Sequence, residues 1–185
     1  MNELEAKQLV QEKLPEKRFA HSLRVAETAV LMARLFKADE KKCHLAGLLH
    51  DYCKYDDLND MHEIVKENSL DDELQLYTSA ILHGPIAAFL MEKEFNIHDE
   101  EILLAIKNHT SGRADMNLVE KIIFVADYIE PARTTPGVED IRDIVYNDHD
   151  LERAVFEITR RNICYLAEQG VKIYSETFKC YNYYN

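Results

Sequence analysis

The sequence predicts an all-α fold that forms one domain. The chain has 185 residues, of which 46% are hydrophobic, but it contains only 5 glycines and 4 prolines. An all-β fold would need more turn residues than this composition supplies. Apolar residues recur at helical spacing along most of the chain, and no segment alternates convincingly between apolar and polar positions. The length suits a single domain, residues 1–185, with a substantial buried core.

The first part of the chain predicts two helices. In the first, apolar residues recur every three or four positions, and His21 lies one turn ahead of them on the same stripe. These residues are Val25, Ala29, Met32 and Phe36. Asp39 can cap a second helix that runs through Leu48 and Leu49 to His50.

The middle of the chain predicts a helix over residues 69–82, because Ser69 and Asp72 resemble a capping box. His83-Gly84-Pro85 is then expected to break the chain, with Pro85 in the first turn of the next helix. Later helices are predicted over residues 99–108, 117–129, 138–145 and 148–169. Gly170 ends the last of them, and the aromatic tail 181–185 either folds back or frays.

Composition argues against several classes of partner. The chain has 22 Lys and Arg against 34 Asp and Glu, a formal charge of −12, and no basic block. A nucleic-acid partner is therefore not expected. The N-terminus lacks an apolar signal region and no stretch is long enough to span a bilayer, so we expect a cytoplasmic protein without membrane contact. The four cysteines form no CxxC pair and are expected to be reduced thiols.

The most informative local feature is the adjacent pair His50-Asp51, which closes an apolar helical segment. Imidazole and carboxylate groups are good metal ligands, and burying them is costly unless something pairs with them. Two other His-Asp pairs, at 98–99 and 149–150, lie among polar residues and are typical of solvated helix starts. Only His50-Asp51 has a core-like setting.

Four further residues have settings that suit a site. His21 lies on an apolar helix face, His83 precedes Gly84-Pro85, and His109 ends an apolar helix. Asp127 follows the apolar run 122–126, where an unpaired carboxylate would be unfavourable. Each alone also fits a hydrogen-bonded core histidine or a buried ion pair. Together with His50-Asp51 they predict a metal site between helices.

The order of His21, His50-Asp51 and Asp127 resembles the HD-domain metal-dependent phosphohydrolases. Longer strings are similar to the YqeK-type branch of that family, the symmetrical bis(5′-nucleosyl)-tetraphosphatases. These strings are GLLHDYCK (47–54), HG (83–84), HTSG (109–112) and ADYIEPAR (126–133). The resemblance implies a single HD-domain fold, with a metal core over residues 15–135 that helices within 136–185 complete.

The resemblance also implies roles for individual residues, to which local position and charge add Lys54, Arg133 and Arg18. The implied metal ligands are His21, His50, Asp51 and Asp127. The implied catalytic residues are Asp51, Lys54, His83 and His109. The implied substrate-binding residues are Arg18, His83, His109, Thr110, Asp127 and Arg133. The resemblance favours iron, as one or two ions, and the same ligand set also suits manganese or zinc.

The implied reaction is the hydrolysis of diadenosine tetraphosphate, a small-molecule substrate, at its central anhydride to give two ADP. His83 and His109 exceed the needs of a one-metal site. They could hold a second ion bridged by Asp51, or they could point at substrate phosphates. Lys54 fits a solvated helix end equally well, and Arg24 is expected to pair with Glu27 or Glu130 on the surface.

Other functions stay open at this stage. Another HD phosphohydrolase could act on nucleoside monophosphates or on a cyclic dinucleotide. A helical di-iron site of histidines and carboxylates could activate dioxygen instead. A metal-stabilised binding module would need the same ligands without any turnover. The oligomeric state also stays open, with a homodimer as one candidate.

Overall fold

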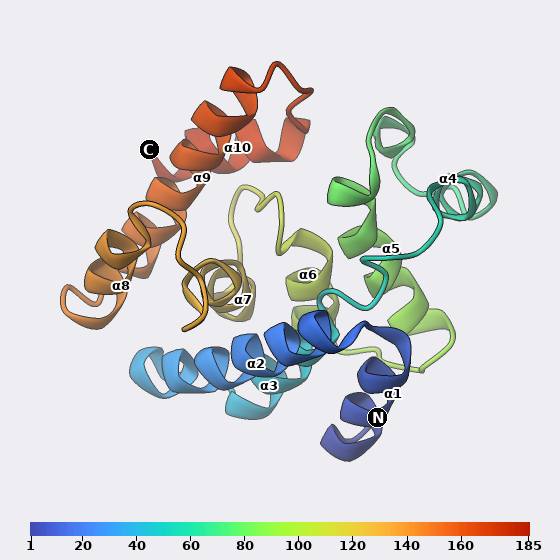
Figure 1. Ribbon diagram of the computed structural model, residues 1–185, viewed down its shortest axis with the longest axis horizontal. Helices are drawn as coiled ribbons and strands as arrows, with labels where there is room; N and C mark the ends of the chain where they lie inside the picture. The colour runs from blue at the N-terminus through green and yellow to red at the C-terminus, as the bar shows by residue number, and fades with distance from the viewer.

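The computed structural model describes all 185 residues and contains ten α-helices, one 3₁₀ helix and no strand (Figure 1). The all-α prediction is confirmed. The helices are α1 (Glu3–Lys13), α2 (Glu16–Phe36), α3 (Glu40–Leu49), α4 (Leu58–Glu67), η1 (Asp72–Leu76), α5 (Ser79–Lys93), α6 (Glu100–Asn108), α7 (Leu118–Ile129), α8 (Val138–Tyr146), α9 (Leu151–Glu168) and α10 (Ser175–Tyr184). No helix has the length and apolar character that a membrane crossing needs.

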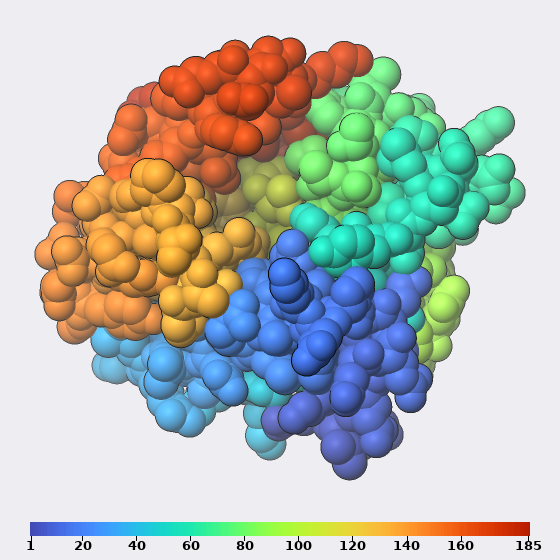
Figure 2. Space-filling view, viewed as in Figure 1, coloured from blue at the N-terminus to red at the C-terminus, as the bar shows by residue number.

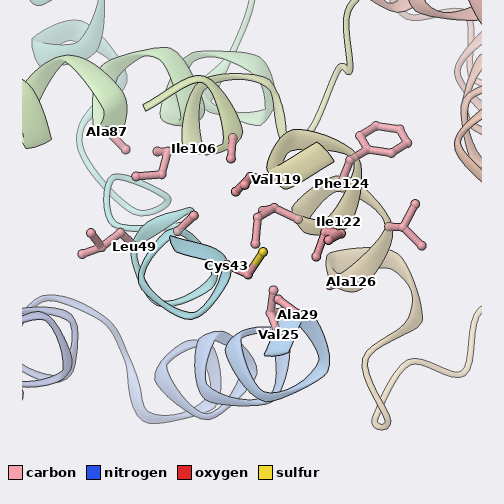
Figure 3. Packing of buried hydrophobic residues seen from close by; sticks show 14 of the residues in the cluster. Val25, Ala29, Cys43, Leu49, Ala87, Ile106, Val119, Ile122, Phe124 and Ala126 are labelled. Carbon is pink, nitrogen blue, oxygen red and sulfur yellow. The ribbon is translucent and has the colours of Figure 1, made fainter. Parts of the chain in front are cut away.

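The centre of the core lies where α2, α3, α6 and α7 pack together (Figure 3). Val25 and Ala29 of α2 lie close to Ile122 of α7, and all three are buried. Helices α2 and α3 approach very closely, because a Cβ atom added at Gly47 would lie 2.7 Å from the Cα atom of Ala26. This approach brings the end of α3 beside α2. A single cluster of 44 buried hydrophobic residues extends from the first helix to the last.

Side-chain caps explain most helix starts. Asp39 accepts hydrogen bonds from two backbone N–H groups of α3, as predicted. Asp99 caps α6, and Asn117 forms a capping box with Glu120 at the start of α7. The predicted helix 148–169 begins later, at α9, because Asp150 is its N-cap.

The prediction for residues 69–85 is wrong in two places. Ser69 has φ +52°, and Asp71 caps the short η1 helix, so no continuous helix spans 69–82. Helix α5 instead starts at Ser79 and runs through Pro85, which lies beyond its first turn. A proline there removes one helical hydrogen bond, but its neighbours His83, Gly84 and Ile86 are all buried. Tertiary packing therefore overrides the local helix-breaking signal.

The C-terminal tail is helical and folds back onto the body. Tyr181 of α10 stacks on Phe156 of α9, with ring centroids 5.4 Å apart. The hydroxyl of Tyr184 accepts a hydrogen bond of 2.9 Å from the backbone N–H of Met116. Helices α9 and α10 consequently form one wall of the molecule, which faces α5 across a hollow in the surface (Figure 2).

Candidate metal centre

Four predicted site histidines converge on the carboxylate of Asp51, whose side chain is 2% exposed. On one side, Asp51 Oδ2 lies 3.1 Å from His50 Nε2 and 3.6 Å from His21 Nε2. On the other, Asp51 Oδ1 lies 3.1 Å from His83 Nε2 and 3.7 Å from His109 Nε2. The histidines come from four different helices or helix ends, namely α2, α3, α5 and α6. The fold therefore brings together residues that span almost ninety positions of sequence from His21 to His109.

Backbone contacts set the tautomer of three of these histidines. The Nδ1 atoms of His50, His83 and His109 each lie within hydrogen-bond distance of a backbone carbonyl oxygen one turn earlier. Those carbonyls belong to Gly47, Ser79 and Ile106, at 2.7, 2.6 and 2.8 Å. Because a carbonyl can only accept, Nδ1 carries the proton, and in the neutral ring Nε2 offers a lone pair toward Asp51.

The facing Nε2 atoms fit a divalent metal ion. The Nε2 atoms of His83 and His109 are 2.9 Å apart although both present lone pairs. The Nε2 atoms of His21 and His50 are buried and have no hydrogen-bond partner. Clustered acceptors of this kind are unfavourable without a cation between them. Two overlapping groups have metal-binding spacing: His21, His50 and Asp127, and His50, Asp51 and His109.

Asp127 joins the cluster from α7, with its Oδ1 atom 3.0 Å from His21 Nε2. Arg133 donates two hydrogen bonds to Asp127, one of 2.8 Å to its side chain and one of 3.0 Å to its backbone carbonyl oxygen. Arg142 of α8 donates to the carbonyl oxygens of Ile129, Glu130 and Arg133, at 3.1, 2.8 and 3.1 Å. The turn that carries Arg133 is thereby fixed to the end of α7.

Glu130 contacts the cluster in a way that the sequence did not reveal. We expected it only as a surface partner of Arg24. Arg24 does donate to Glu130, at 2.6 Å, but Glu130 is 2% exposed. The other carboxylate oxygen of Glu130, Oε1, lies 3.2 Å from His21 Nδ1 and can accept a hydrogen bond from an Nδ1–H group. Glu130 therefore orients the His21 ring with Nε2 toward the cluster, as a carboxylate partner of a metal-binding histidine does.

The electrostatics keep the carboxylates ionised. Burial opposes ionisation of Asp51, but the adjacent His50 holds its pKa well below the ordinary value. Asp127 behaves likewise: against burial, its His21 contact and the Arg133 charge lower its pKa. Both acidic members of the cluster are therefore negative, which is the form that binds metal ions.

Two of the imidazoles are kept neutral. Burial, together with His50 and His83, holds the pKa of His109 well below the ordinary histidine value. Burial is also the main cause that lowers the pKa of His83. His50 differs, because Asp51 raises its pKa against the effect of burial. A cation bound between these rings would replace the proton that Asp51 otherwise favours on His50.

The predicted substrate-binding side chains surround the same cluster. Lys54 Nζ lies 3.2 Å from His83 Nε2 and 3.8 Å from Asp51 Oδ1. Arg18 donates a 2.9 Å bond to Asp51 Oδ2. The hydroxyl of Thr110 lies 3.0 Å from His109 Nε2. Every residue that the sequence analysis assigned to the site lies in or beside this cluster, and Lys54 is no isolated helix-end lysine.

A cavity of about 650 Å³ opens beside the cluster between α7 and α9. Its lining includes His109, Thr110, Asp127, Arg133, Arg161 and Tyr165. Two arginines and two of the candidate metal donors, His109 and Asp127, thus line one space. This suits a ligand that carries several negative charges.

Comparison with known proteins agrees with this geometry. The family model described as HD domain matches residues 18–132, more than half of the chain. The chain belongs to the HD-domain family. It is 53% identical to a Staphylococcus aureus protein, over 100% of this chain and 95% of the relative. A Bacillus subtilis protein is 37% identical over 99% of this chain and 97% of the relative. Both relatives are named "Bis(5'-nucleosyl)-tetraphosphatase, symmetrical".

A solved structure has the same fold along the whole length. A Clostridium acetobutylicum protein, described as a predicted HD superfamily hydrolase involved in NAD metabolism, aligns with a TM-score of 0.93. Its sequence is 35% identical, and the alignment covers 100% of this chain and 97% of that one. This HD-domain protein is therefore a hydrolase that depends on a divalent metal ion, with a His and Asp cluster to hold it.

Proposed function

We propose that this HD-domain protein hydrolyses diadenosine tetraphosphate symmetrically, giving two molecules of ADP. The observation that carries the proposal is the buried cluster of four histidines and two aspartates in a chain that matches its relatives from end to end. Three such relatives, 53%, 41% and 37% identical, are named as symmetrical tetraphosphatases. The cavity beside the cluster presents two arginines, as binding of a polyphosphate chain requires.

We assign the first metal position to His21, His50, Asp51 and Asp127. His83 and His109, together with Asp51, could hold a second ion. Nitrogen and oxygen donors in this ratio suit iron, which we favour, and also manganese or zinc. A divalent ion bound here supplies Lewis-acid charge and lowers the pKa of a water molecule, the usual contribution of metals to phosphate ester and anhydride hydrolysis.

The chain's own side chains bind and orient the substrate. A net charge of −12 repels a polyphosphate at long range, so local cations must offset it. Arg133 can donate two parallel hydrogen bonds to one phosphoryl group because its guanidinium is planar. Lys54 Nζ and the Thr110 hydroxyl lie beside His83 and His109 and can donate to neighbouring phosphoryl oxygens. Arg18 donates to Asp51 Oδ2 and adds positive charge there, whereas Lys54 lies near the other oxygen, Oδ1.

Product analysis tests the proposal directly. Protein purified without oxygen and analysed for metal should convert diadenosine tetraphosphate into ADP alone. AMP together with ATP would contradict symmetrical cleavage even if the metal assignment were correct. Release of inorganic phosphate from a nucleoside monophosphate, or a linear dinucleotide from a cyclic one, would favour another HD phosphohydrolase. Undiminished turnover under strict anaerobiosis would exclude a dioxygen-activating role.

A further inference from the structure

The turn that carries Asp51, residues 50–56, receives little support from its own backbone. Helix α3 ends at Leu49, and the turn itself is not helical. Beyond His50 it has three backbone hydrogen bonds that each span only three residues: Tyr52 to Leu49, Lys54 to Asp51 and Asp56 to Cys53. An α-helix is held instead by a continuous series of bonds that span four residues. Contacts from other helices are therefore needed to fix where Asp51 and Lys54 lie.

Lys13, the last residue of α1, makes two such contacts. Its Nζ atom lies 2.5 Å from Asp56 Oδ1 and 5.3 Å from the centre of the Tyr52 ring, over the ring face. An ammonium group at this distance is attracted to an aromatic face. Because Tyr52 directly follows Asp51 and Asp56 ends the turn, one cation connects both parts of the turn to α1.

Both sides of this contact are held in place. Helix α1 packs against α3 through buried apolar residues, namely Ala6, Val10 and the C-cap Leu14. The Tyr52 ring is 9% exposed and makes a T-shaped contact with Phe95, with ring centroids 5.7 Å apart. Burial lowers the pKa of Lys13, but Asp56 raises it by more, so Lys13 stays cationic.

Helix α1 also lies outside residues 18–132, the part of the chain that matches the HD-domain model. We propose that Lys13 is a positioning residue, which holds turn 50–56 so that Asp51 faces the metal and Lys54 the substrate. Both residues belong to the turn, so a shift of the turn moves a metal ligand and a cation together. This inference rests on the metal site of the proposed function.

The test separates position from charge by the sign of the effect. Lys13→Met removes the cation and keeps an unbranched side chain, whereas Asp56→Asn removes the anion and keeps the volume. Through charge alone the two changes would act oppositely on a bound divalent ion, because loss of a cation favours it and loss of an anion disfavours it. A loosened turn weakens metal binding in both variants. Competition between a chelator and manganese-loaded protein measures the affinity, and we expect it to fall about tenfold in each, as for other outer partners of a metal site.

Two further variants test whether the contact itself is responsible. The double variant Lys13→Met/Asp56→Asn should bind manganese no more weakly than either single variant, because all three break the same contact. Lys13→Arg keeps a cation that can pair with Asp56 and lie over the Tyr52 ring. We therefore expect it to bind manganese like the wild type.

Lys121 provides a matched control. Its Nζ atom lies 2.6 Å from Glu152 Oε1 and 5.5 Å from the centre of the Tyr184 ring, so it makes the same two kinds of contact, with α9 and α10. Lys121→Met and Lys13→Met should each lower the melting temperature by at most about 2–4 °C, because partly exposed ion pairs contribute little to stability. Only Lys13→Met should weaken manganese binding.

Amide hydrogen exchange gives a second readout that needs neither metal nor turnover. Exchange at residues 52–56 should be faster in Lys13→Met than in the wild type or in Lys121→Met. Unchanged manganese binding in Lys13→Met, tighter binding there, or an equal loss in Lys121→Met would overturn the positioning role. AMP with ATP as products would overturn the proposed cleavage alone, because none of these measurements depends on which bond is cut.

Discussion

The two oxygens of Asp51 face surroundings that differ in charge. On the Oδ2 side, a second aspartate, Asp127, lies 3.0 Å from His21 Nε2, and Glu130 stands behind that ring. On the Oδ1 side, His83 and His109 are backed by backbone carbonyls. The nearest charged group on that side is the cationic Lys54. Arg18 also donates to Oδ2, at 2.9 Å. In terms of ligands, the Oδ2 half-site has a second carboxylate and the Oδ1 half-site has neutral imidazoles, and we call the first one the anionic half-site.

This difference indicates which half-site binds its ion more tightly. Anionic ligands attract a divalent cation more strongly than neutral imidazoles do. Arginines limit the repulsion among the acidic groups, because Arg24 pairs with Glu130 and Arg133 with Asp127. We therefore expect the Oδ2 half-site to retain its ion during purification and the Oδ1 half-site to exchange more readily. The predictions below test that expectation, beginning with the residue that both sides share.

Loss of Asp51 should abolish both half-sites and give the largest effect. Asp51→Ala removes the bridging carboxylate, so we expect no retained metal and no detectable turnover, with a helical circular-dichroism spectrum. Loss of an outer partner costs only about 10–100-fold in metal affinity, and loss of this ligand should exceed that. Asp150→Ala is the control, because that aspartate also follows a histidine but only caps α9. Wild-type turnover in Asp51→Ala would contradict the site assignment.

Two milder substitutions should separate the half-sites. Asp127→Asn keeps the side-chain volume but removes the anionic ligand of the Oδ2 side, whereas His83→Gln affects only the Oδ1 side. We expect each variant to lose one of the two ions, with tighter residual binding in His83→Gln than in Asp127→Asn. Metal titration followed by elemental analysis measures both. A large fall in the melting temperature of Asp127→Asn with unchanged metal affinity would mean that Asp127 is a structural carboxylate.

The sequence predicted which residues form the cluster better than it predicted the residues that orient them. His50-Asp51 and Asp127 were recognisable because polar residues in apolar helical segments need partners, a signal that adjacent residues carry. The role of Glu130 was not recognisable in this way. Glu130 directly precedes a proline at a helix end, and only the packing of α7 against α2 points its carboxylate at His21.

The errors in the fold have the same origin. Pro85 and Ser69 carry strong local signals, but long-range packing decided how residues 69–93 fold. The cavity between the start of α5 and the helices α9 and α10 could not be predicted from local pattern. Its walls include Leu76, Tyr165 and Tyr174, which come from segments far apart in the sequence. Taken separately, each of these residues looks like an ordinary surface or core position. Local pattern therefore predicts buried polar residues and most helices, and the family resemblance implies which of those residues are ligands. Cavities depend on tertiary contacts.

Glu130→Gln should weaken only the anionic half-site, by about 10–100-fold in metal affinity. The amide oxygen can still accept from His21 Nδ1, so the ring stays oriented, but the negative charge that strengthens His21 as a ligand is lost. Glu120→Gln is a matched control, because Glu120 is likewise buried and paired with an arginine, Arg113, at 2.6 Å. That control should lose stability and keep metal affinity. Equal losses of metal affinity in both variants would contradict a specific role for Glu130.

Arg133→Ala should have the smallest effect and act on the substrate rather than on the metal. Arg133 and Asp127 keep 37% and 22% of their side chains exposed, so water can partly replace the lost contact. We expect kcat/KM for diadenosine tetraphosphate to fall by about 5–30-fold, with most of the change in KM. Metal content should be unchanged, because Arg133 offers no ligand atom. Arg153→Ala, which breaks an exposed pair with Asp148, should leave the kinetics unaltered. Loss of metal in Arg133→Ala would instead make Arg133 part of the charge balance that holds the Oδ2 half-site together.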